Sequence, residues 1–257
     1  SFFPTFDMLK CLCPLSDLEK GKTMKKYQKD DLVSYTLGAF PSIELIKHRP
    51  QDVVVVYQSS RYEHAEELAH LCQKHHVPFE TNDKAIEKLS DKDNVFVIAV
   101  FRKFVSPLSQ GHHVVLVHPE NMGNFGTIVR TVAGFGLKDI AVILPAIDVF
   151  DPKAVRASMG SLFHVNIQTF ASFEAYREVF PSHVLYPLML QSATYLDQMS
   201  FPKVPSALVF GPEGNGLTDK FSTFGKSIKI RQDASVDSFN LPIAVAVAVF
   251  EFTRQMR

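Results

Sequence analysis

Three stretches rich in glycine and asparagine hold the residues that could carry chemistry. The first, His118–Arg130 (HPENMGNFGTIVR), follows a strand-like run and opens a helix. Its glycines and asparagines allow left-handed backbone and side-chain capping of a helix N-terminus, where exposed amides attract an anion. If Asn124 caps this helix, Arg130 lies one turn after Gly126, and its guanidinium reaches back over a bare residue. We expect Arg130 to face a ligand on this loop, although a capped turn with a surface arginine explains the pattern equally well.

The second stretch, Leu208–Leu217 (LVFGPEGNGL), ends a buried strand in three glycines that let a ligand approach the backbone. The carboxylate of Glu213 can accept hydrogen bonds there. The stretch matches neither the phosphate-binding P-loop nor the dinucleotide fingerprint. Because α/β sheets bind ligands at the carboxyl ends of parallel strands, binding is favoured over an ordinary tight turn.

The third stretch, Ile228–Asn240 (IKIRQDASVDSFN), runs into an apolar tail. On its own it is explained by Ser238 or Asn240 capping a final helix. No Ser-His-Asp or paired-carboxylate arrangement surrounds these loops, and the ten histidines are scattered. The sequence therefore predicts no metal site.

Alternating strand-like and helix-like runs position these stretches in a domain of residues 112–257. Strand-like runs are expected at 113–117, 140–144, 164–169, 206–210 and 227–230, and helices at 127–135 and 152–158. Strands separated by helices predict a parallel sheet with helices on both faces. The tail from Leu241 to Phe252 is ambiguous, because residues 243–249 alternate as a strand does, whereas its length and Pro242 also allow a buried helix.

A smaller α/β domain is expected at residues 30–104. Its β-branched runs at 53–57, 77–80 and 95–100 alternate with an amphipathic segment at 63–75. Turn-forming residues at 105–111 predict a linker. Residues 1–29 are expected to form a leader that is partly disordered or non-native, since residues 1–23 differ in character from the rest of the chain and Met24 would make a natural start.

Composition fits two globular domains. Of the 257 residues 46% are hydrophobic, which supplies a core, and 27 basic residues balance 27 acidic ones, so any nucleic-acid site must be a local patch. Three cysteines are too few for a disulfide framework and indicate a reducing cytoplasm. No apolar run is long enough to cross a membrane.

Taken in order, the three stretches resemble the signature motifs of the TrmH-like (SpoU) branch of the SPOUT methyltransferases, over residues 112–257. The family's Asn-x-Gly loop and arginine correspond to Asn124, Gly126 and Arg130. Its Gly-x-Glu-Gly-x-Gly loop corresponds to Gly211, Glu213, Gly214 and Gly216. Its third motif corresponds to Ser238-Phe239-Asn240, and residues 156–161 (RASMGS) resemble a further family segment.

The resemblance implies a deep trefoil knot in the C-terminal domain, a bent S-adenosylmethionine held by the knot, a homodimer through that domain and a helical tail. It implies methylation of RNA, either tRNA or rRNA, at a ribose 2'-hydroxyl. The catalytic residues it implies are Arg130, Asn124, Glu213, Ser238 and Asn240. The arginine of this family is often drawn as the general base, but a guanidinium is a poor proton acceptor, so we expect Arg130 to clamp the adjacent phosphate or to stabilise a developing oxyanion. The cofactor-binding residues it implies are Gly211, Gly216, Leu217, Ile230 and Phe239.

The domain at 30–104 is similar to the ribosomal-protein-like RNA-binding domain often joined to this catalytic unit. Its candidate phosphate contacts are Lys47, His48, Arg49, Arg102 and Lys103.

Three positions depart from the family pattern. Phe239 replaces a leucine, Gln232 a methionine and Ala234 a glycine, and the larger ring is expected to narrow the cofactor pocket. These departures leave open a non-catalytic RNA-binding protein that keeps the fold, for which no S-adenosylmethionine binding is expected. A generic nucleotide-binding module would instead bind ATP or NAD.

Overall fold

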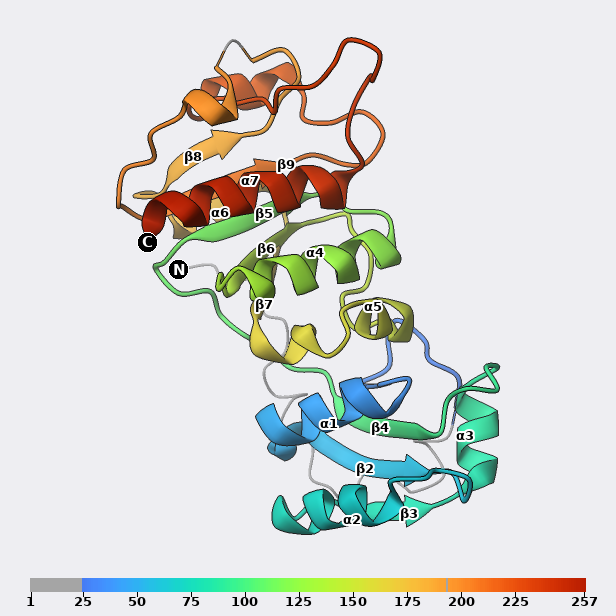
Figure 1. The fold of residues 1–257 in the computed structure, drawn as a ribbon. Coiled ribbons are helices and arrows are strands. Elements are labelled where there is room, and N and C mark those ends of the chain that lie inside the picture. Colours follow the sequence, from blue (N-terminus) through green and yellow to red (C-terminus); the bar gives the residue numbers. More distant parts are fainter. Residues whose placement is uncertain (1–24, 193) are drawn as a thin grey trace. The chain divides into compact units, whose positions relative to one another are not determined.

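The computed structural model describes residues 25–192 and 194–257, so most of the expected leader, with Cys11 and Cys13, lies outside the described residues. The chain forms two compact units (Figure 1). Of the described residues, the first unit comprises 25–104 together with 150–163, and the second comprises the rest. Residues 150–163, which sequence analysis groups with residues 112–257, thus pack with the first unit.

The first unit holds a four-stranded sheet in the order β1-β4-β2-β3. Its strands are β1 (Val33–Tyr35), β2 (Val53–Gln58), β3 (Phe79–Thr81) and β4 (Val97–Arg102). β4 is antiparallel to both neighbours, and β2 is parallel to β3. The helices are α1 (Ala39–His48), α2 (Ala65–Lys74) and α3 (Asp83–Leu89), with a short 3-10 turn η3 (Pro50–Asp52). The predicted runs match β2, β3, β4 and α2 within two residues, whereas β1, α1 and α3 were not predicted.

An aromatic cluster fastens residues 150–163 within the first unit. This segment contains α5 (Pro152–Ala157) and leads into the 3-10 turn η4 (Ser161–His164). Phe163 meets Phe101 edge to face at 5.4 Å between ring centroids, and Phe150 meets Phe104 at 4.9 Å. Such pairs add to the stabilisation from burial alone.

The second unit is built on a five-stranded sheet in the order β7-β6-β5-β9-β8, in which every pairing is parallel. The strands are β5 (His113–Val117), β6 (Asp139–Ile143), β7 (Asn166–Phe170), β8 (Val184–Pro187) and β9 (Ser206–Phe210). The predicted parallel sheet is confirmed, and β5 and β9 have the predicted bounds. The strand predicted at 227–230 is wrong, because this segment forms only isolated bridges to Leu188 and Tyr195.

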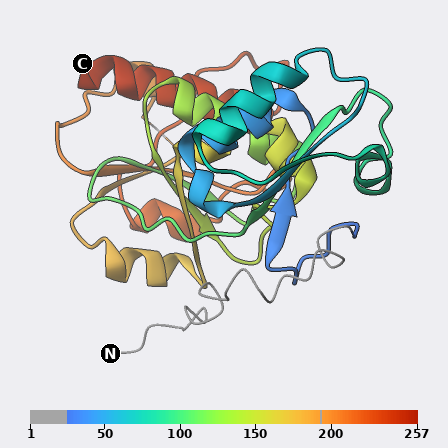
Figure 2. The same cartoon turned by 90° about the horizontal axis from the view of Figure 1, so that it is seen from below.

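Helices cover both faces of this sheet (Figure 2). α4 (Met122–Gly134) and α7 (Leu241–Met256) pack against one another on one face. On the other face, Phe173 and Tyr176 of α6 (Phe173–Val179) share a core with Val115 and Ala141. Two 3-10 turns, η5 (Leu196–Gln198) and η6 (Asp219–Thr223), lie in the connections.

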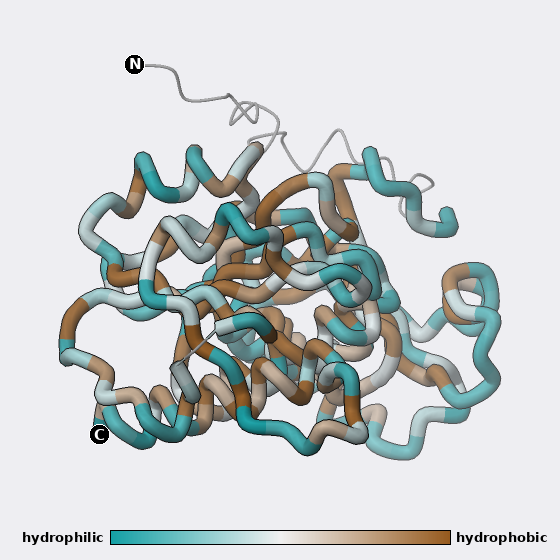
Figure 3. The backbone as a smooth tube through the Cα atoms, turned by 90° about the horizontal axis from the view of Figure 1, so that it is seen from above, coloured by the Kyte–Doolittle hydropathy of each residue, from teal (hydrophilic) through white to brown (hydrophobic). Residues whose placement is uncertain are grey.

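The ambiguous tail is a helix, α7. Val245, Ala248, Val249 and Phe252 are buried at helical spacing, while Ile243, Val247 and Phe250 are exposed. Figure 3 shows hydrophobic segments along most of this helix, which leads to the C-terminus. No helix within residues 25–192 and 194–257 has the length and hydrophobicity needed to cross a bilayer.

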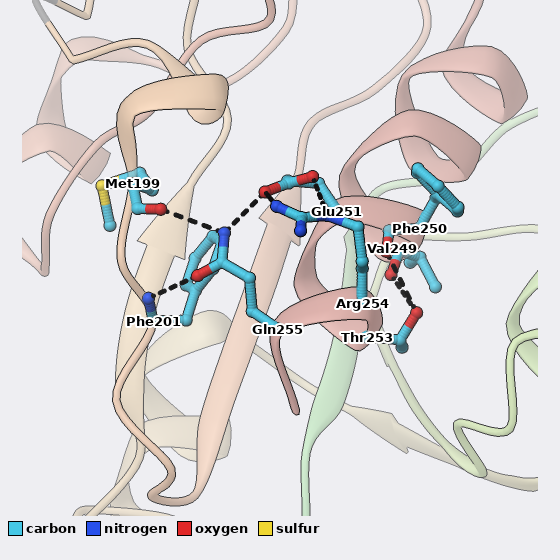
Figure 4. Close-up of polar contacts among 8 residues, drawn as sticks. All are labelled: Met199, Phe201, Val249, Phe250, Glu251, Thr253, Arg254 and Gln255. Carbon is cyan, nitrogen blue, oxygen red and sulfur yellow. Dashed lines mark hydrogen bonds and ion pairs between the residues drawn. The ribbon is translucent and has the colours of Figure 1, made fainter. Parts of the chain in front are cut away.

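A side-chain network fixes the C-terminal end of α7 (Figure 4). The Gln255 amide nitrogen donates to the Met199 carbonyl at 3.0 Å, and its Oε1 accepts from the Phe201 amide at 3.0 Å. Gln255 also donates to Glu251 at 2.6 Å. One amide side chain thereby ties the last turn of α7 to the segment that precedes β9.

Candidate functional site

The first stretch forms a turn that leads from β5 into α4. Asn121, rather than Asn124, caps the helix, since its side-chain oxygen accepts from the Asn124 amide at 2.9 Å. The helix therefore begins at Met122, five residues before the predicted Thr127. Arg130 still lies one turn after Gly126, as expected from their spacing.

Glu213 ties the second stretch to this turn. Its carboxylate accepts hydrogen bonds from the amides of Glu120 at 3.2 Å and Asn121 at 3.3 Å, and from the side-chain nitrogen of Asn124 at 3.4 Å. Unpaired amides at a helix N-terminus favour a negative charge, which Glu213 supplies. Its role in this geometry is to hold two loops together.

The loop at 211–217 folds tightly on itself. A Cβ atom on Gly211 would overlap the backbone of Gly216 and Leu217, so this position admits only glycine without a shift of the loop. Gly216 has a φ of 64°, in the left-handed region that favours glycine, and its amide donates to the Pro212 carbonyl. The glycines thus give the loop its shape and leave its backbone accessible.

The third stretch runs beside β8. Ile228 donates its amide to the Pro187 carbonyl at 2.9 Å and accepts from the Met189 amide at 2.9 Å. Further on, the Gln232 side chain donates to the carbonyls of Val236 and Asp237, both at 3.0 Å. Gln232, which departs from the family pattern, therefore closes the loop that leads to Ser238.

The second and third stretches line one cavity of about 170 Å³, and the first stretch is joined to it by the hydrogen bonds of Glu213. Seven of the residues proposed for the site line it: Gly211, Glu213, Gly216, Leu217, Ile230, Ser238 and Phe239. Phe239 is 38% exposed at the cavity. The walls are mostly apolar, and the 211–217 loop contributes its backbone along one side.

Three proposed residues lie outside the lining. Asn124 contacts the cavity only through Glu213. Asn240 is the residue before α7, where its carbonyl accepts from the amides of Ile243 and Ala244, but its side chain makes no capping bond. Arg130 is exposed on α4 and has no hydrogen-bond or ion-pair partner among residues 25–192 and 194–257. Its guanidinium is therefore available to a ligand from outside the chain.

Sequence reasoning missed part of the wall. The missed residues follow β8, lie within the third stretch or belong to the first turns of α7: residues 188–191, Lys229, Gln232, Leu241 and Ala244. The four-residue strand that precedes 188–191 gives no periodic signal. Gln232 stands out in the sequence only as a departure from the family pattern.

A cation–aromatic cluster stands next to this wall. The Lys229 ammonium and the Arg231 guanidinium lie over the Tyr195 ring at 4.6 Å and 3.9 Å, and Arg231 pairs with Asp197 at 3.1 Å. Lys229 also lines the cavity. The cluster therefore brings positive charge to the cavity edge.

The amino-terminal end of β5, the central strand of the same sheet, holds a buried histidine. His113 lies between the Tyr176 hydroxyl at 2.8 Å and the Ser109 carbonyl at 2.9 Å, and its ring stacks on His183 at 4.3 Å. Burial disfavours the charged ring and lowers the pKa of His113 to about 4. His113 was not predicted as a special position, because the scattered histidines gave no pattern.

The candidate RNA contacts of the first unit are largely engaged within the chain. Arg49 bonds to Asp52 at 2.6 Å and lies over the Phe104 ring at 3.6 Å. Lys103 donates to the Lys29 carbonyl at 2.6 Å, and Lys47 lies 3.8 Å from Glu44. The Nε of Arg102 is buried without a hydrogen-bond partner in the described chain.

In a comparison with known proteins, residues 111–250 match a family model that is described as the SpoU rRNA Methylase family. An uncharacterised tRNA/rRNA methyltransferase of Synechocystis is 32% identical over 145 residues, which cover 55% of this chain and 53% of that protein. The 23S rRNA (uridine(2479)-2'-O)-methyltransferase of Streptomyces viridochromogenes is 29% identical over 157 residues, covering 55% and 52%. The chain thus spans about half the length of these curated relatives.

A solved structure extends the likeness to the whole fold. The AdoMet-bound rRNA methyltransferase from Sinorhizobium meliloti matches with a TM-score of 0.77 at 22% identity, covering 100% of this chain and 98% of that one. At this identity, the match concerns the fold.

Proposed function

The chain belongs to the SpoU rRNA methylase family, and on this premise we propose that it transfers the methyl group of S-adenosylmethionine to a ribose 2'-hydroxyl of RNA, either tRNA or rRNA. The observation that carries the proposal is the meeting of the second and third stretches at one cavity, where Glu213 of the lining is bonded to the turn that begins the Arg130 helix. The named relatives are methyltransferases, and this favours an enzyme over a non-catalytic RNA-binding protein.

The cavity suits S-adenosylmethionine in two respects. Apolar side chains, among them Leu188, Phe210 and Ile230, offer surfaces for a planar adenine. The bare backbone at Gly211, where no side chain fits, offers amides and carbonyls to polar groups. We assign Gly211, Gly216, Leu217, Ile230 and Phe239 to cofactor binding, and Phe239 is expected to narrow the pocket.

When bound, S-adenosylmethionine supplies an electrophilic methyl group. The chain then has to hold a ribose 2'-oxygen in line with that group and allow one proton to leave. Arg130 is a poor proton acceptor, because a guanidinium offers only N–H donors. We assign Arg130 instead to a clamp on the neighbouring phosphate or to stabilisation of the developing oxyanion.

Four further residues position the site. Glu213 and Asn124 hold the loops in register through their hydrogen bonds. Ser238 at the lining and Asn240 at the start of α7 orient the nucleotide. Among the described residues of the lining, only Glu213 carries a carboxylate, and its oxygens already accept hydrogen bonds from two backbone amides. The proton is therefore assigned to water or to a phosphate oxygen.

Arg130→Ala tests this assignment. Loss of the clamp is expected to lower methyl transfer to RNA by about 100-fold or more, as for other transition-state donors. Affinity for S-adenosylmethionine should stay at the wild-type value, because Arg130 lies outside the cavity lining. Arg130→Lys keeps the positive charge but loses the planar guanidinium with its paired donors. Its rate of methyl transfer is therefore expected to lie between those of the wild type and Arg130→Ala.

Tritiated methyl transfer to total RNA and calorimetric titration with S-adenosylmethionine supply the two readouts. Undiminished transfer by Arg130→Ala contradicts the role of Arg130. Absence of S-adenosylmethionine binding by the wild type contradicts the proposed function itself.

We also propose a homodimer through the second unit. α7 exposes Ile243, Val247 and Phe250 on one side, at 53%, 39% and 52% of their surfaces. Phe250 also packs against Phe135 at the end of α4, so the apolar stripe continues onto a second helix. A contiguous exposed apolar face of this kind is typical of an interface.

The remaining assignments rest on the family. We propose that the C-terminal segment passes through a deep trefoil knot. Residues 30–104 are assigned to RNA binding, with Lys47, Arg49, Arg102 and Lys103 as candidate contacts, residues 105–111 to a linker and residues 112–257 to catalysis. The reduced, buried thiol of Cys72 is consistent with a cytoplasmic location.

A further inference from the structure

A second, larger cavity lies on the other side of the 211–217 loop. It has a volume of about 360 Å³, within the range of small-molecule sites. The ends of β5 and β6, the start of α6 and the turn η6 surround it, and Pro212 and residues 215–217 line both cavities. A group bound here would be separated from the cofactor cavity by one loop. The residues already assigned to catalysis do not explain this cavity.

Its walls combine aromatic rings with positive charge. Phe173, Phe221 and Phe224 form a cluster with ring centroids 4.8 to 5.6 Å apart. The Lys220 ammonium, which lines the cavity, lies 5.4 Å from the Phe224 ring centroid and pairs with the lining carboxylate of Glu174 at 2.6 Å. The Arg177 guanidinium, beside the lining, lies 4.5 Å from the same centroid. Unpaired RNA bases stack on aromatic rings and guanidinium planes, and flanking cations attract the phosphates.

Polar groups capable of reading a base edge stand beside these rings. The exposed amide of Asn215 offers both a donor and an acceptor. His118 Nδ1 lies 3.2 Å from the Pro145 carbonyl, which can only accept, so Nδ1 carries the proton and Nε2 of the neutral ring is an acceptor. An acceptor at that position suits the exocyclic amino group of adenine or cytosine.

The backbone of His118 is independently unusual. Its φ of 51° lies in the left-handed region, which residues with a side chain seldom adopt and which is concentrated at functional sites. At the end of β5, in the cavity wall, a residue with an imidazole ring therefore adopts a backbone conformation that favours glycine.

From these observations we propose that the second cavity binds an unpaired base of the RNA substrate, from a nucleotide next to the methylated one. The proposal rests on the proposed function, because it requires RNA at the neighbouring cofactor cavity. The cavity then selects which RNA sequence places its ribose at the methyl donor.

Binding of homopolymeric oligoribonucleotides to the full chain tests the proposal. Fluorescence anisotropy with labelled oligo-A, oligo-C, oligo-G and oligo-U of roughly 12 nucleotides measures base preference. The variants are Asn215→Ala and His118→Gly, the second of which removes the ring and suits the left-handed backbone. Gln198→Ala, an exposed amide outside both cavities, is the matched control.

We expect the wild type to prefer one homopolymer and each variant to bind it about 5- to 10-fold more weakly, the effect of one lost hydrogen bond. The control should bind as the wild type does, and the His118→Gly and Gln198→Ala proteins, whose altered positions lie outside the lining of the cofactor cavity, should keep their affinity for S-adenosylmethionine. Equal affinity of wild type and both variants for every oligomer overturns the proposal, as does equal affinity of the wild type for all four.

Free nucleoside monophosphates form a second arm. Tight binding of a monophosphate that RNA does not compete away identifies the site as one for a free nucleotide and also overturns the proposal. Failure of the proposed function is distinct, because it appears as absent S-adenosylmethionine binding or absent methyl transfer by the wild type.

Discussion

Two glycines of the 211–217 loop differ in whether the loop has room for a side chain. A Cβ on Gly211 would overlap neighbouring backbone, whereas one on Gly214 would meet nothing within 4 Å. We expect Gly211→Ala to lower the free energy of unfolding by about 1–3 kcal/mol, as overpacking does. It should also weaken S-adenosylmethionine binding roughly tenfold or more, since the loop lines the cavity. Gly214→Ala is the matched control and should stay near wild type in both.

Urea unfolding and calorimetric titration measure these two effects. A Gly211→Ala protein with wild-type cofactor affinity would show that the loop backbone does not form the cofactor site.

His113 makes stability depend on pH. Burial lowers its pKa from 6.5 to about 4, so between these values the unfolded chain binds a proton that the folded chain does not. Folding stability should therefore fall as the pH falls from 7 to 5, by about 2 kcal/mol from this group. Burial also lowers the pKa of His112 and His183, which adds to the same trend.

Urea unfolding at pH 7 and pH 5, with wild type and His113→Gln, tests this account. The variant is expected to be less stable at pH 7 but to lose less stability on acidification. An unchanged pH slope in the variant would assign the dependence to other groups.

At the scale of elements, two neighbouring side chains at the end of α7 should contribute unequally to the free energy of unfolding. Gln255 satisfies the Phe201 amide and the Met199 carbonyl, whereas Arg254 pairs with Glu251 at the surface (Figure 4). Gln255→Leu leaves backbone groups unsatisfied and should lower the free energy of unfolding by about 1–3 kcal/mol. Arg254→Ala should cost less than about 0.5 kcal/mol, because exposed ion pairs contribute little. Chemical denaturation compares them, and equal losses would contradict the ranking.

Elements with strong local signals could be predicted from the sequence. β5 and β9 are buried apolar runs bounded by turn residues, and their bounds were predicted. α4 was predicted to begin too late because two asparagines can cap it, and only the geometry selects Asn121. α7 stayed ambiguous because residues 243–249 alternate, and burial at helical spacing resolves it. α6 and β8 are short and depend on tertiary packing, so no local pattern identified them.

At the scale of the whole molecule, the apolar stripe on α7 should govern assembly. Val247→Asp places a charge in the proposed interface and is expected to convert a dimer into a monomer. Val179→Asp, at an equally apolar exposed position on α6, is the control and should leave the dimer intact. Sedimentation velocity distinguishes the two species. A monomeric wild type, or a dimer that survives Val247→Asp, contradicts the proposed interface.

The candidate site was predictable where motifs carry it and hidden where the fold assembles it. The glycines and Glu213 stand out in sequence because their spacing is unusual. The hydrogen bonds that the amides of Glu120 and Asn121 donate to Glu213 span more than ninety residues, so only the folded sheet brings these groups together. The second cavity was not predicted, although His118, Pro212 and residues 215–217 belong to the first two stretches, because separate elements contribute the rest of its wall.

The chain passes between its two units after Phe104, Val149 and Phe163, so neither half is a continuous length of sequence. A fragment that starts at Val105 keeps Phe150 and Phe163 but loses Phe101 and Phe104, the rings on which they rest. Cutting the chain at this boundary would expose apolar surface to water and promote aggregation.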